Sequence, residues 1–359
     1  MSAISNPSPL GNKRPTNYKS ILLVFIFVLI AIAGLSYVKW WPYYHKAIKA
    51  ATEHSIGSSI LTGDLATAPA PSIQAAWDYA VAYFQSVWKA AVLGILLGSL
   101  VQVLIPAKWL IRVLGKTSFG STAIGGLASI PGMMCTCCAA PIAVGLRKRN
   151  VSVGASLAFW LGNPVLNPAT LIFMTFVLSW KFTIMRIVFG LILTFAVSYF
   201  ANRFAGASTV PQTVDDAVHK TSEPEGPLMS RWLKSAGTML LTVVPAYFIS
   251  VVLLGAARAW MFPVLGEGAM NGILAIVIFA IAGTLFVIPT AAEIPIIATF
   301  LSFGFGTGVA GALLVTLPSI SLPSLLMVYR SFPRRVIWFV CISVVVLGLL
   351  SGVIGTFIL

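Results

Sequence analysis

Charged residues are scarce in this sequence of 359 residues: only 9% are Asp, Glu, Lys or Arg, whereas 58% are hydrophobic. A soluble domain usually carries about 25% charged residues. So large an apolar fraction cannot be hidden inside one water-soluble core, because surface grows too fast relative to volume. The composition therefore excludes an ordinary soluble protein and indicates a membrane protein.

The sequence also lacks the alternation of apolar and polar residues that strands of outer-membrane barrels show over about ten positions. Its apolar runs are continuous instead, as in Ile21–Ala33 and Val336–Leu350. Continuous runs are typical of membrane-spanning helices. We therefore predict an all-α polytopic membrane protein.

Acidic residues are few, with 9 against 23 Lys and Arg, and the net charge is +14. The basic residues lie mostly in short loops beside apolar runs, which is the positive-inside pattern. We therefore expect a lipid bilayer and no nucleic acid as a partner. No small-residue cleavage site follows the first apolar run, so we predict a retained helix. The expected location is the bacterial inner membrane, with the N-terminus in the cytoplasm.

Apolar runs and polar stretches together predict six regions along the chain. In order, they are a disordered cytoplasmic tail (1–20), an extra N-terminal transmembrane helix (21–41), an external loop (42–79), a first transmembrane repeat (80–203), a cytoplasmic linker (204–233) and a second transmembrane repeat (234–359).

The two predicted repeats share residues at a constant spacing. Four features recur 154 residues later: Thr136 as Thr290, Pro141–Ile142 as Pro295–Ile296, Gly154 as Gly308, and Pro164 as Pro318. Duplicated halves are common among secondary transporters. We therefore predict an internal duplication.

Prolines interrupt two apolar segments in each repeat, at Ile130–Gly132 and Gly162–Pro164 in the first. Broken backbone at membrane depth survives only where protein or a water-filled cavity satisfies its polar groups. Together with the distribution of basic residues, the breaks predict two inverted structural repeats. About seven full spans are expected, with re-entrant hairpins over 117–146 and 271–303. The alternative is eight or nine transmembrane helices, some of them kinked.

Cysteine is rare, and three of the four cysteines lie together as Cys135, Cys137 and Cys138. Thiolates are soft ligands that suit thiophilic cargo such as Cu(I), so all three are candidate substrate or metal ligands. On a helix, Cys135 and Cys138 would share a face while Cys137 points elsewhere, so a pair or a trio could form the site. No second Cys pair or His partner follows, which excludes a tetrahedral zinc pattern. The alternative is that these are small, buried packing residues.

Glu293 is the one acidic residue inside an apolar segment. An ionisable group at that depth is costly, so we predict that it takes up a proton during transport. The alternative is an interfacial Glu that reaches headgroups or a helix end. Asn163 and Asn167 lie at the second helix break and are candidates to line the pathway, to satisfy freed backbone groups, or both. Thr136 and Thr290 are further candidate substrate-binding residues.

The run Cys135-Thr136-Cys137-Cys138-Ala139-Ala140-Pro141, followed by Gly154–Phe159 and Asn163–Pro168, resembles the ArsP/YraQ group of predicted permeases. The resemblance covers most of 85–357 and leaves out the N-terminal helix. It implies a permease with the three cysteines as candidate substrate ligands, and some members of the group export trivalent organoarsenicals. This chain has Cys-Thr-Cys-Cys where relatives often have Cys-Ser-Cys-Ser, so the resemblance does not establish arsenic as the cargo.

The leading functional hypothesis is a proton-coupled secondary exporter of a small thiophilic solute, without enzymatic activity or a cofactor. One alternative is a transporter of a metal ion or of a reduced sulfur compound. Another is a membrane thiol-disulfide oxidoreductase, and a third is a membrane scaffold or insertase. The sequence leaves the oligomeric state open.

Overall fold

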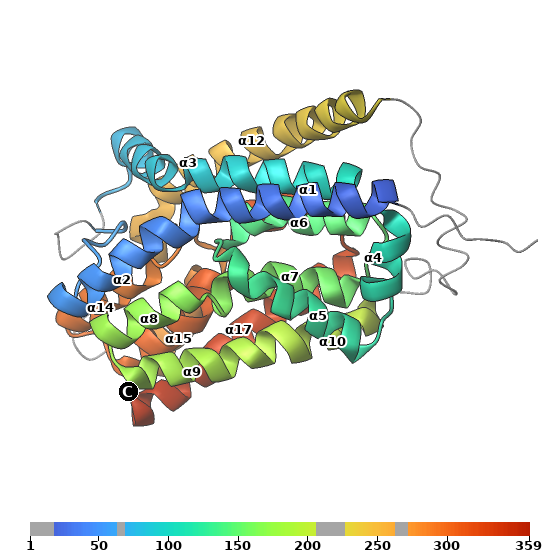
Figure 1. Cartoon of the computed structure of the whole chain (residues 1–359). Helices are drawn as coiled ribbons and strands as arrows, with labels where there is room; N and C mark the ends of the chain where they lie inside the picture. Colours follow the sequence, from blue (N-terminus) through green and yellow to red (C-terminus); the bar gives the residue numbers. More distant parts are fainter. Residues whose placement is uncertain (1–17, 63–68, 206–226, 263–271) are drawn as a thin grey trace, which may run out of the picture.

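The computed structural model describes residues 18–62, 69–205, 227–262 and 272–359, which form a helical bundle (Figure 1). No strand occurs in these ranges. Within them, seven helical stretches are long and apolar enough to cross a membrane: Ile21–Glu53, Ile73–Leu104, Val153–Val177, Trp180–Phe204, Leu228–Met261, Thr307–Val328 and Arg334–Ile358. The predictions of an all-α polytopic protein and of about seven spans are therefore confirmed.

Two of the predicted regions fall largely outside this description. The predicted tail is described only from residue 18, and the predicted linker lies outside the described residues from 206 to 226. The last part of that linker belongs to α12 (Leu228–Met261).

The N-terminal helix extends beyond residue 41, its predicted end, to Glu53. It consists of α1 (Tyr18–Leu35), a π-helical turn η1 (Ser36–Trp40) and α2 (Trp41–Glu53). Pro42 comes directly after the π-helical turn, so the helix continues through a residue that has no N–H to donate. α2 also packs against α8, where Tyr43 meets Phe173 edge to face. The predicted external loop is therefore shorter, since α3 (Ile73–Leu104) already begins at Ile73.

A helical hairpin interrupts the first half of the bundle. After α4 (Ala107–Leu114), α5 (Phe119–Ser129) runs into a 3-10 turn over Ile130–Gly132, and α6 (Thr136–Lys148) follows. Neither helix is long enough to cross about 30 Å of hydrocarbon at 1.5 Å per residue. The predicted break at Ile130–Gly132 is thus confirmed.

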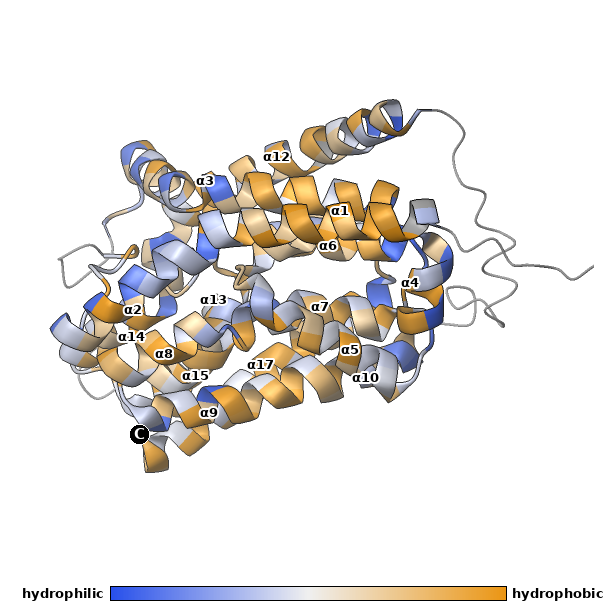
Figure 2. Cartoon of the chain, in the orientation of Figure 1, coloured by the Kyte–Doolittle hydropathy of each residue, from blue (hydrophilic) through white to orange (hydrophobic). Residues whose placement is uncertain are grey.

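The second half holds a similar pair, α13 (Ile273–Leu285) and α14 (Glu293–Ser302), joined by non-helical backbone. In Figure 2, drawn in the orientation of Figure 1, α5 lies toward the end of the bundle where α1 begins, whereas α13, which begins 154 residues after α5, lies toward the opposite end. This placement supports the inverted arrangement, which stays a prediction.

The spans that follow each hairpin include broken and bulged helices, whereas the last of them, α17 (Arg334–Ile358), is continuous. In the first half they are α7 (Val153–Val165), α8 (Pro168–Val177), α9 (Trp180–Leu191), a π-helical turn η3 (Ile192–Val197), α10 (Ser198–Ala201) and a 3-10 turn (Asn202–Phe204). In the second half they are α15 (Thr307–Ser319), α16 (Leu322–Val328) and α17. α15, α16 and α17 each begin 154 residues after α7, α8 and α9. The common spacing supports the predicted duplication.

One predicted break is displaced. α7 continues through Gly162–Pro164 and ends at Val165, so the chain leaves the helix at Leu166 and Asn167. Pro164 lies in the last turn of α7. Its carbonyl would normally accept a hydrogen bond from residue 168, but that residue is a proline without an N–H. The carbonyl accepts from Arg186 instead.

Large apolar side chains cover the outside of the bundle, including those of Phe25, Leu241, Trp338 and Phe357. Figure 2 shows these hydrophobic surfaces along α1, α9 and α12. Lipid is the solvent that such a surface requires. The chain is therefore a multi-pass membrane protein.

Candidate functional site

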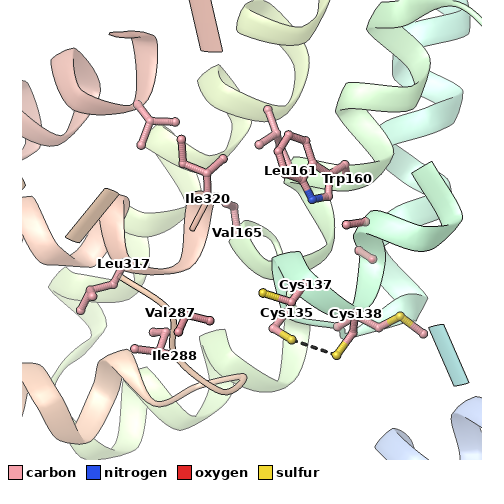
Figure 3. Packing of buried hydrophobic residues seen from close by; sticks show 14 of the residues in the cluster. Cys135, Cys137, Cys138, Trp160, Leu161, Val165, Val287, Ile288, Leu317 and Ile320 are labelled. Carbon is pink, nitrogen blue, oxygen red and sulfur yellow. Dashed lines mark hydrogen bonds between the residues drawn. The ribbon is translucent and has the colours of Figure 1, made fainter. Parts of the chain in front are cut away.

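Two thiols meet at the start of α6. Cys135 is the residue that caps the helix and Cys138 lies in its first turn, and their Sγ atoms are 3.0 Å apart (Figure 3). Both side chains are buried, and all four cysteines are free thiols. The predicted pairing of Cys135 with Cys138 is confirmed.

Cys137 points away from this pair, as Figure 3 shows. Its Sγ lies 3.3 Å from the Oγ of Ser321, which precedes α16. Among the described residues, no group of three or more His, Cys, Asp or Glu side chains could hold a metal ion. Successive residues of a helix diverge by about 100°, so the three thiols do not gather at one point. Which of the three bind a solute or a metal ion stays a prediction.

A lysine that sequence reasoning missed lies beside the pair. Lys39, in the π-helical turn, donates from Nζ to the Oγ1 of Thr290 at 3.1 Å and to the hydroxyl of Tyr43 at 3.0 Å. Only 5% of its side chain is exposed. The indole of the next residue, Trp40, donates to the carbonyl of Pro131 at 2.8 Å. The N-terminal helix is thereby attached to the hairpin break that carries the cysteines.

Several predicted site residues line one small cavity of about 10 Å³: Cys135, Thr136, Thr290 and Glu293. Pro164, Pro289 and Pro318 also line it, so broken segments of both halves meet there. Such a volume holds about one water molecule. The structure thus brings the predicted thiol and carboxyl groups together around one small cavity.

Glu293 forms a buried ion pair with Arg186, which sequence reasoning also missed. The Nη2 of Arg186 lies 3.2 Å from the Oε1 of Glu293, and both side chains are almost fully buried. Glu293 is also the first residue of α14, so it lies at a helix end, as the alternative predicted, but it is buried rather than directed at headgroups. Proton uptake by Glu293 stays a prediction. The signal for Arg186 was present in the sequence, since it is a lone basic residue inside the apolar segment predicted over 183–202.

Arg186 also binds three main-chain carbonyls at helix breaks. It donates to the carbonyl of Val165 at 2.9 Å, to that of Pro164 at 3.0 Å and to that of Leu314 in α15. Buried carbonyls without partners would cost free energy, and the guanidinium satisfies them with a rigid set of donors. One residue of α9 therefore connects both halves of the bundle.

The two asparagines have structural contacts. Asn167 caps α8, with its Oδ1 accepting from the amides of Ala169 at 3.0 Å and Thr170 at 3.3 Å. Asn163 donates from Nδ2 to the carbonyl of Phe159 at 2.9 Å. Neither residue lines the small cavity. Asn167 therefore satisfies freed amides at the start of α8, while a role of either asparagine in lining the pathway stays a prediction.

A family model described as "Predicted permease", ArsP_1, matches residues 86–357. The chain belongs to this family of predicted permeases. One relative matches a longer part of the chain than the family model does. The UPF0718 protein YraQ of Escherichia coli K12 is 50% identical over 327 residues, which cover 91% of this chain and 93% of that protein.

More distant relatives are found in other microbes. The UPF0718 protein YcgR of Bacillus subtilis is 24% identical over 283 residues, covering 72% of this chain and 89% of that protein. The UPF0718 protein MJ0584 of Methanocaldococcus jannaschii is 34% identical over 104 residues, 28% of each chain. No solved structure matches this chain. Membership of the permease family and the seven candidate spans together indicate a membrane transporter rather than an enzyme.

Proposed function

We propose that this chain carries a thiophilic solute across the bacterial inner membrane and binds it through Cys135 and Cys138. The observation that supports the proposal is the 3.0 Å separation of two buried thiols beside a small cavity in the middle of the bundle. Thiols are soft ligands that suit thiophilic cargo. The N-terminus lies in the cytoplasm and the solute moves outward in this scheme.

A thiol pair offers two ligands to a cargo with two exchangeable positions. A trivalent monoalkyl arsenical has that valence: CH₃As(OH)₂ and two thiols give CH₃As(SR)₂ and two waters, so two sulfurs satisfy it. A reduced sulfur compound can accept weak hydrogen bonds from the two S–H groups. Arsenite, which exchanges three hydroxyls, would leave one position unfilled, since Cys137 points away from the pair.

Glu293 supplies the proton coupling in this proposal. Protonation of its carboxylate removes the charge that Arg186 faces at 3.2 Å. Since both groups are buried, the change in charge weakens a contact between α9 and α14, and it does so beside the cavity that Cys135 lines. Proton uptake at Glu293 and solute binding at Cys135 thereby affect the same small volume.

The test is solute accumulation in sensitive cells that express the chain. Cells are exposed to methylarsenite, arsenite, Cu(I), Hg(II) or thiosulfate and carry the wild type, a Cys135→Ser/Cys138→Ser variant, or Cys137→Ser. Cys341→Ser, in α17 away from the pair, is the matched control for loss of a thiol. We expect cells with the wild type, Cys137→Ser or Cys341→Ser to accumulate less of one solute than cells with the Cys135→Ser/Cys138→Ser variant. Equal accumulation of every solute in all strains would refute thiol-dependent transport.

The close thiols also favour a second candidate, a membrane thiol-disulfide oxidoreductase. Two sulfurs at 3.0 Å need little movement to form a disulfide. This reaction does not require the Arg186–Glu293 pair to change its protonation. Glu293→Gln therefore separates the two functions. A coupled transporter loses activity, whereas a redox protein still reduces a small disulfide reagent to two thiols while Cys135 and Cys138 become a disulfide.

A further inference from the structure

A second, larger cavity adjoins the cysteine site. It has a volume of about 570 Å³ and lies between α2, the loop before α3, the first turns of α3, the end of α12 and the segment that precedes α14. It shares Pro289, Thr290 and Ala291 with the small cavity that Cys135 lines. A solute in the large cavity is therefore separated from the thiols by a single layer of residues.

Positive charge dominates the lining of this cavity. Lys39, Lys46 and Arg258 line it, against the single carboxylate of Asp78. The Asp78 side chain is exposed and its Oδ1 accepts a hydrogen bond from Gln74 at 2.8 Å. The net charge of the lining is positive even when Asp78 is ionised, so the cavity attracts anions.

Two of the three cations are buried without a carboxylate partner. Lys39 is 5% exposed and Arg258 is 6% exposed. The ion pairs within the described part of the chain join other residues, namely Lys49 with Glu53 and Arg186 with Glu293. Arg258 donates only one long hydrogen bond, from Nη2 to the carbonyl of Ala75 at 3.4 Å, and its Nε has no partner among the described residues. Each cation also lies over a tyrosine ring, Lys39 at 5.1 Å from the centroid of Tyr43 and Arg258 at 5.4 Å from that of Tyr79. Burial of a charge without a carboxylate partner is costly, so an anion in this cavity would be stabilised by both side chains.

The uncharged lining suits an oxyanion. Hydroxyl groups of Tyr43, Ser58, Ser59 and Thr290 face the same space as the cations. Hydroxyl and N–H groups together are the donors that bind oxygen atoms carrying negative charge. Lys39 belongs to both sites, because its Nζ contacts Thr290 at the boundary between the two cavities.

We propose that the large cavity binds a small sulfur oxyanion with a terminal sulfur, of the thiosulfate class, and presents that sulfur to Cys135 and Cys138. The inference rests on the proposed function, since it names the solute class that the thiol pair receives. Lys39 and Arg258 neutralise the oxygen end, and the thiols donate weak S–H hydrogen bonds to the soft end. Metal cations are repelled by the same three charges, and neutral solutes gain nothing from them.

The test is binding of radiolabelled thiosulfate and sulfate to the full-length protein in detergent micelles, measured by scintillation proximity. Sulfate is the matched probe, since it has the oxygen atoms but no terminal sulfur. The variants are Lys39→Met, Arg258→Gln and Cys135→Ser/Cys138→Ser. Lys49→Met is the control, because it removes the same charge from an exposed position of α2, in the same N-terminal helical stretch as Lys39. Lys39→Arg keeps the positive charge. A normal gel-filtration profile and retained anion binding in this variant would show that the protein still folds when residue 39 is substituted.

We expect wild type and Lys49→Met to bind both anions. Lys39→Met and Arg258→Gln should each weaken both by about tenfold or more, as loss of a charged hydrogen bond implies. The cysteine variant should weaken thiosulfate alone. Absence of sulfate and thiosulfate binding in the wild type, or an equal loss in Lys49→Met, would overturn the anion site. Unchanged thiosulfate binding in the cysteine variant, with Lys39 still required, would instead refute the cysteine step and with it the proposed function.

Discussion

Arg186 offers the sharpest energetic test of the structure. Arg186→Met removes a buried ion pair with Glu293 and leaves the carbonyls of Pro164, Val165 and Leu314 without their donor. Removal of one partner of a buried pair costs about 3–5 kcal/mol. In a membrane the unfolded chain also finds polar partners, so we expect the low end, about 3 kcal/mol.

Glu293→Gln should cost less. The variant keeps an oxygen acceptor of the same shape for Arg186, and the three carbonyls still receive hydrogen bonds. The remaining loss is that of a charged hydrogen bond, about 1.5–3 kcal/mol. When Arg186 is already absent, the same substitution removes an uncompensated buried carboxyl, so the double variant should be no less stable than Arg186→Met alone. The coupling energy of the cycle should therefore be about 1.5 kcal/mol or more.

The assay is unfolding of the purified protein by SDS in mixed micelles, followed by far-ultraviolet circular dichroism. Arg335→Met, at an exposed position of α17, is the control for loss of an arginine and should stay within about 0.5 kcal/mol of wild type. Additive losses in the double variant would refute an energetic link between Arg186 and Glu293. An Arg186→Met variant as stable as Arg335→Met would refute the claim that this side chain satisfies the broken helices.

Two further predictions concern packing and capping. A Cβ on Gly94 would overlap the carbonyl oxygen of Cys138. Gly94→Ala should therefore lower the unfolding free energy by about 1–3 kcal/mol and change the rate at which Cys138 reacts with a maleimide. Gly237→Ala, whose Cβ meets nothing nearby, should do neither. Normal thiol reactivity in Gly94→Ala would contradict the close approach of α3 and α6. Asn167→Ala should lower the unfolding free energy by about 1 kcal/mol, because α8 loses its N-terminal cap. In the same SDS titration, Asn167→Ser should be more stable than Asn167→Ala, because serine also caps a helix. A serine variant no more stable than the alanine variant would contradict the capping role.

The sequence was most informative about elements whose signal is local. Continuous apolar runs predicted the spans, and Ile130–Gly132 predicted the hairpin break, because proline and glycine disrupt a helix wherever it lies. The end of the N-terminal helix could not be predicted, since Pro42 is compatible with a helix start and α2 is stabilised by its contact with α8. The end of α7 could not be placed either. Its last carbonyls, those of Pro164 and Val165, accept hydrogen bonds from Arg186, which lies on another helix.

The candidate site was partly predictable for the same reason. The spacing of Cys135 and Cys138 implied a shared helix face, and the depth of Glu293 implied a functional carboxyl. The partners Lys39 and Arg186 come from other helices, so no local pattern places them beside those residues. Their only sequence signal was a basic residue next to or within an apolar run, which the positive-inside pattern explained too readily as a loop or interface charge.

The π-helical turn at Ser36–Trp40 has a consequence for how the N-terminal helix must be aligned among homologous chains. A π-turn is an α-helix with one residue inserted, and such turns are frequent at functional sites. The insertion rotates every following residue by about 100° relative to those before it. α1 can therefore keep a lipid-facing register while Lys39 and Trp40 face Thr290 and Pro131. A single-residue deletion in this turn would return the helix to one register, and the lysine would then be lost from the site without any change in the residues that surround the cysteines.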